Sequence, residues 1–284
     1  MAGGDPGMID GKTKLIAHLG YPTESFKAPM IYNPYFAKYG INAVVVPMGC
    51  KPDDFQLFLK LLFRLTNIHG ALITMPHKVS IIALLDEVSV SVKVAGACNA
   101  VRVGPDGKLI GDMFDGEGFV RGVRRKDRKL ANARVLVSGN GGVGSAIAAS
   151  FAKSGAAELA LFDVFAPAMN GLAERLRANY PDLKISVGSN DPNGYDVVVN
   201  ATPLGMKPDD PLPIDVNRIA PSTFVGEVVM KAEITPFLAA ARERGCDYQI
   251  GTDMLFEQIP AYMEFFGFGT TTPEELRSVA QIHY

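Results

Sequence analysis

The segment over residues 135–151 constrains the fold most, because an apolar, strand-like run passes through a glycine-rich turn into a run of small residues. Its glycines fit the pattern G-x-G-x-x-G at Gly139, Gly141 and Gly144. The first glycine permits a sharp turn, the second lets the backbone approach a pyrophosphate, and the third lets the helix pack on its strand. The helix N-terminus then directs N–H groups and a partial positive charge at the phosphates. The segment therefore predicts a dinucleotide-binding turn with the contact residues Gly139, Gly141, Gly142, Val143 and Gly144.

An acidic residue follows the turn at the distance expected for a ribose contact. Residues 158–162 read as the next strand, and Asp163 ends it about 20 residues beyond the turn. A 2′-phosphate beside this carboxylate would meet like charge, and residues 163–169 contain no Arg or Lys to hold it. NAD is therefore expected rather than NADP. NADP stays open if Asp163 turns away and Arg175 reaches in.

Composition excludes several classes of protein. The chain has 284 residues, enough for about two domains, and a net charge of −2, which gives no electrostatic case for nucleic acid or an anionic membrane. No apolar run reaches membrane-spanning length, and the N-terminus lacks the pattern of a signal peptide. The three cysteines and four histidines show no metal-ligand spacing, and the odd cysteine count favours a reducing compartment. We expect a cytoplasmic, metal-free monomer or homodimer that takes a small-molecule substrate.

Two α/β segments follow one another along the chain. The first is expected to contain strands at 14–20, 42–47 and 71–75, helices at 29–38, 53–65 and 79–85, and paired strands at 94–103 and 108–114. The second is expected to contain six strands, at 135–137, 159–162, 185–187, 197–200, 224–230 and 248–250, with a bare loop between the third and fourth. This predicts a two-domain α/β fold: an N-terminal α/β substrate domain over residues 1–117, completed by C-terminal helices within 254–284, and a Rossmann, doubly wound dinucleotide-binding domain over residues 118–253.

A hydride transfer also needs a group that moves the hydroxyl proton, and Lys78 is the strongest candidate. It stands at the expected start of the helix over 79–85, where the helix dipole would lower the pKa of a lysine. Asp115, at a strand end, is its natural carboxylate partner. The alternative role for Asp115 is to cap a helix that begins near Glu117.

At these residues the chain resembles the shikimate and quinate dehydrogenases. The matching motifs occur in the family's order over nearly the whole chain: Gly20-x-Pro22 with Pro29, Thr74-x-Pro76-x-Lys78, Gly96-Ala97-x-Asn99, Gly111-Asp112-x-x-Asp115-Gly116, the glycine turn, Asn200-Ala201-Thr202-x-x-Gly205-Met206, Thr235-Pro236-Phe237-Leu238 and Gly251-x-x-Met254-Leu255-x-x-Gln258. The resemblance implies an NAD(P)-dependent alcohol dehydrogenase that acts on a ring hydroxyl, with a substrate domain opposite a dinucleotide-binding domain.

The resemblance also implies roles for single residues. Lys78 and Asp115 would form the catalytic pair, and the residues that match substrate-hydroxyl positions are Thr74, Asn99 and Gln258. The residues expected at the cofactor are Asn200, Ala201, Thr202, Val228, Gly251 and Met254. Each of the three residues at substrate-hydroxyl positions also has a purely structural alternative: Thr74 would be an ordinary strand residue, Asn99 would be a turn residue, and Gln258 would lie on a solvated helix face.

The chain departs from the family in the substrate pocket. Phe26 and Ala28 stand where the family has a pair of serines that grip the substrate carboxylate, and Leu72 stands where it has Asn. Met230 replaces a tyrosine, and Met113-Phe114 replaces Asn-Thr. Each polar partner lost to a buried polar substrate costs about 1–3 kcal/mol. Phe26 and Ala28 therefore predict an altered substrate, less anionic or more apolar, for which shikimate itself is poor.

Two alternatives stay open at this point. Ser25 or Lys27 could supply a substitute contact to a carboxylate, which would leave an ordinary shikimate or quinate dehydrogenase with a rearranged pocket. A dinucleotide-binding regulator without turnover is the alternative outside enzymes. The retained Lys78 and Asp115 argue against the regulator, because a protein that only binds has little need of such a lysine.

Overall fold

The computed structural model describes residues 9–24, 26–207 and 209–282, and these form two compact units. Unit 1 comprises the described residues within Met1–Ser89, Ala97–Asp112 and Ile259–Tyr284, and unit 2 comprises Val90–Gly96 and Met113–Gln258. Compared with the boundaries expected from the sequence, unit 2 begins earlier, at Met113, and also takes in a short segment around Val94. The chain returns to unit 1 at Ile259.

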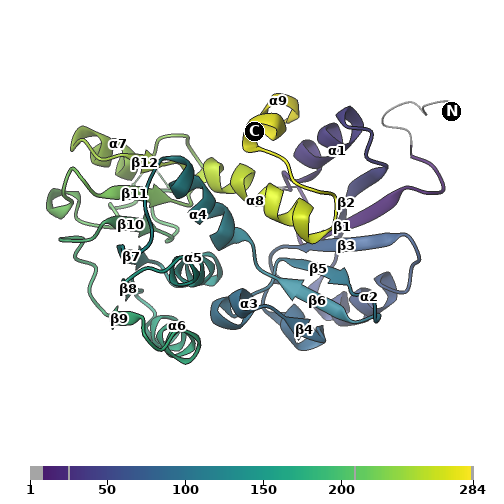
Figure 1. The fold of residues 1–284 in the computed structure, drawn as a ribbon, viewed down its shortest axis with the longest axis horizontal. Coiled ribbons are helices and arrows are strands. Elements are labelled where there is room, and N and C mark those ends of the chain that lie inside the picture. The colour runs from purple at the N-terminus through teal and green to yellow at the C-terminus, as the bar shows by residue number, and fades with distance from the viewer. Residues whose placement is uncertain (1–8, 25, 208, 283–284) are drawn as a thin grey trace. The chain divides into compact units, whose positions relative to one another are not determined.

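Unit 1 is built on a six-stranded mixed sheet in the order β2-β1-β3-β5-β6-β4. Its strands are β1 (Lys14–Gly20), β2 (Ala43–Gly49), β3 (Ile68–Ile73), β4 (Glu87–Val88), β5 (Ala100–Val103) and β6 (Leu109–Asp112). β1 pairs in parallel with β2 and β3, whereas β5 runs antiparallel to β3 and β6. The helices of this unit are α1 (Pro29–Lys38), α2 (Pro52–Leu62), the 3-10 helix η1 (Ser80–Leu84) and α9 (Pro273–Val279) (Figure 1).

Unit 2 carries a six-stranded parallel sheet in the order β12-β11-β10-β7-β8-β9 (Figure 1). Its strands are β7 (Arg134–Ser138), β8 (Glu158–Phe162), β9 (Lys184–Val187), β10 (Val197–Asn200), β11 (Phe224–Glu227) and β12 (Tyr248–Gln249). This is the strand order of a doubly wound dinucleotide-binding sheet, so the predicted fold class is confirmed. Its helical segments are α3 (Val90–Ala95), α4 (Asp115–Arg125), α5 (Gly142–Lys153), α6 (Ala166–Asn179), η2 (Val216–Arg218), α7 (Pro236–Glu243) and the first part of α8 (Gly251–Phe265).

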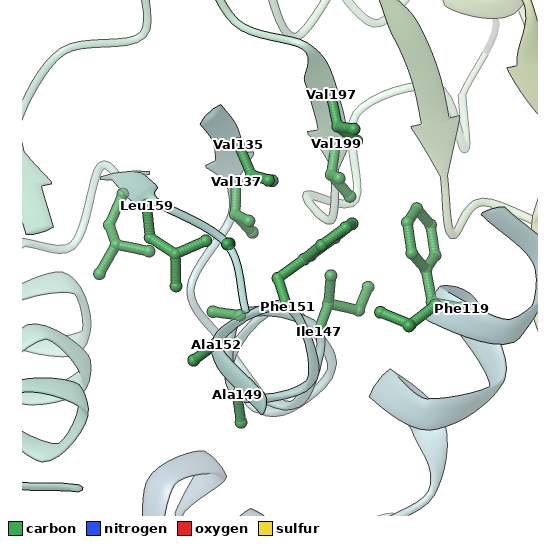
Figure 2. Packing of buried hydrophobic residues seen from close by; sticks show 14 of the residues in the cluster. Phe119, Val135, Val137, Ile147, Ala149, Phe151, Ala152, Leu159, Val197 and Val199 are labelled. Atoms are coloured by element: carbon green, nitrogen blue, oxygen red, sulfur yellow. The ribbon is translucent and has the colours of Figure 1, made fainter. Parts of the chain in front are cut away.

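Apolar side chains on both faces of the parallel sheet hold its helices in place. Val135 and Val137 of β7 point to one face and pack with Phe151 of α5, as Figure 2 shows. Leu136, between them, points to the opposite face and packs with Phe237 of α7. A strand covered on both faces has to be apolar at every position, which explains the unbroken Val-Leu-Val run.

Two predictions were wrong for elements in unit 1 or next to it in the sequence. The helix expected over residues 79–85 is the short 3-10 helix η1 rather than an α-helix. Residues 90–95 form helix α3, although the strand was expected to begin at residue 94. The β-branched sequence of α3 favours a strand, but Val92, Val94 and Ala95 are buried and α3 packs against α5 and α6, so tertiary packing overrides local propensity.

Two element ends in unit 2 also differ from the prediction. β11 ends at Glu227 rather than at residue 230. Helix α4 begins at Asp115 with Phe114 as the residue before it, so Asp115 is not the cap of a later helix. The loop between β9 and β10 carries no helix, as expected. Among the described residues, no helix is long and apolar enough to span a bilayer.

Candidate active site

The glycine turn of unit 2 has the geometry that its sequence pattern predicts. Gly139 has a φ of +91°, and a Cβ on it would lie 2.5 Å from the carbonyl carbon of Ala201. A Cβ on Gly144 would lie 1.8 Å from the carbonyl oxygen of Gly139. A Cβ on Gly141, by contrast, would meet nothing within 4 Å. Gly139 and Gly144 are therefore required by the packing of the protein itself, whereas Gly141 leaves room for a ligand to approach the backbone.

The start of α5 can receive a phosphate. Gly141 is the N-cap residue and offers no side chain to accept from the first-turn N–H groups, and both Gly141 and Gly142 are exposed. Val143 is half-buried and packs on the core. An uncapped helix N-terminus with exposed glycines presents backbone donors and the positive end of the helix dipole to an anion.

Asp163 lies directly beside the turn. Its Oδ2 accepts a hydrogen bond of 2.6 Å from the backbone N–H of Asn140, and its Oδ1 accepts one of 2.8 Å from Phe165 N–H. These bonds fix the carboxylate, and its remaining lone pairs can accept hydroxyl donors. Arg175, the base considered for a 2′-phosphate, donates its Nε–H to the carbonyl of Val94 at 2.7 Å and so lies against α3.

The loop after β10 is organised by a buried amide. Asn200 is fully buried, and its Nδ2 donates to Leu204 O at 3.1 Å and to Glu227 Oε2 at 3.0 Å. Its Oδ1 accepts from the N–H and the hydroxyl of Thr202 at 3.0 and 2.6 Å. The amide of Asn200 thus shapes the loop, and its expected contact with a cofactor stays a prediction. Ala201 and Thr202, which are half-buried, are the members of this motif that lie against the glycine turn.

Glu227 is a buried acid that the motif search did not single out. It is fully buried at the end of β11, and burial raises the pKa of its carboxyl, although hydrogen bonds from Thr235 and Asn200 act in the opposite direction. An acid in the apolar sequence 224–229 is the signal that could have identified it. Through Asn200, Glu227 supports the loop that contacts Gly139.

The other residues predicted at the cofactor, and Gln258, which is predicted at the substrate, also have structural contacts. Gly251 is required because a Cβ on it would lie 2.1 Å from the carbonyl oxygen of Val229. Met254 is 5% exposed and packs in the same hydrophobic core as Phe151, with Val228 at its border. Gln258 lies on α8 against Gly118 of α4, and its Oε1 is buried with no hydrogen-bond partner among the described residues. Gln258 is thus not the fully solvated residue of the structural alternative.

Unit 1 brings several predicted substrate residues together around the end of β1. The side chains of Thr74 and Phe26 both converge on Gly20, where a Cβ would lie 2.4 Å from Thr74 Cγ2 and 2.8 Å from Phe26 Cζ. The ring of His18 stacks on Phe26 with centroids 4.1 Å apart. Ala28 is half-buried just ahead of α1, and Leu72 is buried in β3.

Lys78 acts electrostatically on this group of side chains. It is half-buried, and its charge acts on both His18 and Cys98. Burial raises the pKa of Cys98 to about 12, so this thiol is protonated at neutral pH. The backbone carbonyl of Lys78 accepts a hydrogen bond of 2.7 Å from Cys98 N–H, which ties the Lys78 segment to the start of β5. His77, next to it, is not available for chemistry, because its Nε2 bonds Cys50 O at 2.7 Å and its ring stacks on Phe55.

Asn99 and Asp115 occupy buried positions at the ends of regular elements. Asn99 extends the pairing of β5, since its N–H donates to Asp112 O at 3.0 Å and its carbonyl accepts from Ile73 N–H at 2.8 Å. Asp115 is 5% exposed and is the first residue of α4, where the helix dipole favours an anion. Asp115 belongs to unit 2 and Lys78 to unit 1, so their pairing stays a prediction.

Comparison with known proteins identifies the family. A model of the shikimate dehydrogenase substrate binding domain matches residues 19–101. A shikimate dehydrogenase (NADP(+)) of Rubrobacter xylanophilus is 33% identical over 254 residues, which cover 88% of this chain and 89% of that protein. The chain belongs to the shikimate dehydrogenase family. This confirms the predicted oxidoreductase class, that of NAD(P)-dependent enzymes acting on a CH–OH group.

Solved structures with the family's fold are also similar over nearly their whole length. Shikimate 5-dehydrogenase from Listeria monocytogenes, in complex with shikimate and NAD, has a TM-score of 0.88 and 25% identity, covering 95% of this chain and 97% of that one. Quinate dehydrogenase from Corynebacterium glutamicum, in complex with NAD, has a TM-score of 0.84 and 26% identity, covering 94% and 98%. In the described part of this chain, no group of three or more His, Cys, Asp or Glu residues could hold a metal ion.

Proposed function

We propose that this chain transfers a hydride between a nicotinamide dinucleotide and a ring hydroxyl of a shikimate- or quinate-like cyclic alcohol. The observation that carries the proposal is the glycine turn of unit 2, where Gly141 is open to a ligand and Asp163 is fixed beside it. A phosphate fits the start of α5, and the ribose hydroxyls fit the carboxylate. When bound, the nicotinamide would accept the hydride from the carbinol carbon.

The remaining chemistry belongs to Lys78 and Asp115. In the direction of oxidation, the amine of Lys78 accepts the hydroxyl proton as the hydride departs, which leaves a ketone and an ammonium. The carboxylate of Asp115 holds that ammonium in place. Support comes from the charge of Lys78 acting on His18 and from the Thr74-x-Pro76-x-Lys78 motif, which the family model covers.

The substrate of this chain is altered from that of the family's namesake. Phe26 presents an aromatic ring and Ala28 a methyl group at the positions where the family has its carboxylate-gripping serines, and Leu72 is an apolar side chain where the family has Asn. A carboxylate transferred onto such a surface loses hydrogen bonds with water and gains none from these three side chains. The preferred substrate is therefore a cyclic alcohol with an uncharged group in place of the carboxylate, and shikimate itself is poor.

NAD is the preferred cofactor. The relative from Rubrobacter is named for NADP(+), whereas the structures from Listeria and Corynebacterium are complexes with NAD. In this chain the carboxylate of Asp163 repels a 2′-phosphate, and Arg175 is occupied at α3.

The experiment measures initial rates with NAD and NADP on a panel of shikimate, quinate and cyclic alcohols without a carboxylate. We expect turnover of carboxylate-free alcohols with NAD and little with shikimate. Brisk oxidation of shikimate would refute the altered pocket. If no alcohol in the panel reduces either dinucleotide, the chain acts as a dinucleotide-binding regulator instead.

Cofactor choice is tested separately with Asp163→Asn. We expect the ratio of kcat/KM for NAD to that for NADP to fall at least tenfold, because the repulsion of the 2′-phosphate is removed. The matched control is Asp182→Asn, an exposed acid in the turn before β9, at the opposite end of the strands from Asp163. Equal ratios for Asp163→Asn and the wild type would contradict the assigned role.

A further inference from the structure

His18 is a buried polar residue for which the mechanism above has no use. It lies in β1, in the otherwise apolar sequence Leu-Ile-Ala-His-Leu, and is 8% exposed. Its Nδ1 is enclosed by protein and has no hydrogen-bond partner among the described residues. A buried polar atom without a partner is costly, so a residue of this kind calls for an explanation.

The neighbouring strands cannot supply the missing bond. His18 pairs in register with Pro47 of β2 and Leu72 of β3. Directly paired residues place their side chains on the same face of a sheet, and neither a proline ring nor a leucine side chain offers a donor or an acceptor. The imidazole therefore stands among apolar side chains within the sheet.

The face of the sheet that carries His18 is the one that carries the predicted substrate residues. Gly20 is two residues further along β1, so its side-chain direction is that of His18. That direction leads to Thr74 and Phe26, and the ring of His18 lies on Phe26 at 4.1 Å with an interplanar angle of 27°.

The ring is uncharged at neutral pH. Burial, reinforced by the nearby charge of Lys78, lowers the pKa of His18 to about 4. A neutral imidazole carries one N–H and one lone pair, and an enclosed N–H without an acceptor is rarer in proteins than an enclosed lone pair. We therefore assign the lone pair to the enclosed Nδ1 and the proton to Nε2.

We propose that His18 is a specificity-determining residue, whose Nε2–H donates a hydrogen bond to an uncharged hydroxyl or carbonyl oxygen of the substrate while the apolar face of the substrate ring lies on Phe26. The inference rests on the proposed function and names the substrate class of the same site. A neutral donor beside an aromatic ring offers directionality without a counter-charge, so it selects an alcohol, ketone or ester over a carboxylate.

The test uses shikimate and methyl shikimate, which differ in the charge of one group. We expect the wild type to oxidise the ester with a higher kcat/KM than the acid. His18→Val should lower kcat/KM for the ester by about tenfold or more, whereas His18→Gln, which keeps a donor, should retain a larger share of it. The Kd of NADH should be the same in all three proteins, because the glycine turn is untouched.

A second measurement uses the wild-type protein and needs no variant to fold. With ¹⁵N-labelled histidine, methyl shikimate added to the NADH-bound protein should shift the Nε2 signal of His18 and leave that of His77 in place. An unchanged His18 signal, or equal kcat/KM for the ester in His18→Val and the wild type, would overturn the inference. A shifted signal without oxidation of either compound would refute the proposed turnover while supporting the binding role of His18.

Discussion

Gly139 and Gly141 stand two residues apart in the same turn, yet the structure assigns them opposite sensitivities to a methyl group. In Gly139→Ala the new Cβ would lie 2.5 Å from the carbonyl carbon of Ala201 and 2.6 Å from Thr202 N, both backbone atoms, at a φ of +91°. The left-handed conformation costs an L-residue about 1–2 kcal/mol. Overpacking against backbone adds about 1–3 kcal/mol. We expect Gly139→Ala to lower the free energy of unfolding of unit 2 by about 2–5 kcal/mol.

Gly141→Ala is the matched control for stability and the sharper probe of binding. Gly141 has a φ of −69° and a ψ of −166°, which alanine adopts without strain, and the new methyl group would meet no protein atom within 4 Å. Its free energy of unfolding should stay within about 0.5 kcal/mol of the wild type. The same methyl group would occupy the space through which a pyrophosphate reaches the backbone, so the Kd of NADH should rise at least tenfold.

Two assays separate these effects: urea unfolding followed by circular dichroism, and NADH titration followed by fluorescence. The expected pattern is a destabilised Gly139→Ala and a stable Gly141→Ala that binds NADH weakly. If Gly141→Ala bound NADH as tightly as the wild type, the turn would not be the phosphate site. If Gly139→Ala were as stable as the wild type, the loop after β10 would not be packed on the turn as described.

Two further predictions concern unit 1. Lys78→Ala should abolish alcohol oxidation while leaving the Kd of NADH nearly unchanged. Steady-state turnover and NADH titration measure the two effects, and loss of both oxidation and NADH binding would indicate a merely structural role. The pKa of His18 is lowered from 6.5 to about 4, so the ring stays neutral in the folded protein while the unfolded chain takes up a proton below pH 6.5. The contribution of the neutral His18 ring to the free energy of unfolding is thus fully present above pH 6.5. As the pH falls towards 4, this contribution decreases by about 3 kcal/mol. Urea unfolding of the wild type and of His18→Val at several pH values measures this contribution as the difference between their free energies of unfolding. A difference that does not vary with pH would contradict the burial of the ring.

Most of the fold could be predicted from local patterns. The strands of unit 2 are apolar because the sheet is covered on both faces, and the glycine turn marks the first of them, so a doubly wound sheet could be predicted. The failures came where packing outweighs local preference. The segment Val90–Ala95 has the composition of a strand but forms a helix, because its buried side chains meet α5 and α6.

The candidate site could be predicted only as a set of residues. Motif spacing picked out Thr74, and the departure from the family picked out Phe26; unit 1 brings these two side chains together. The motifs did not predict that Asn200 supports a loop through its own hydrogen bonds, because burial depends on contacts between segments far apart in the chain. His18 carried no motif at all.

The sequence by itself determined the class of fold and the position of the glycine turn, because each of these is a property of a short stretch of chain. Only the tertiary structure decided that Glu227 and Asn200 support the turn, and that His18 is buried against Phe26 beside Lys78. The physical reason is that desolvation and hydrogen-bond satisfaction arise between strands and loops that are distant in sequence, and no local pattern encodes which of them will meet.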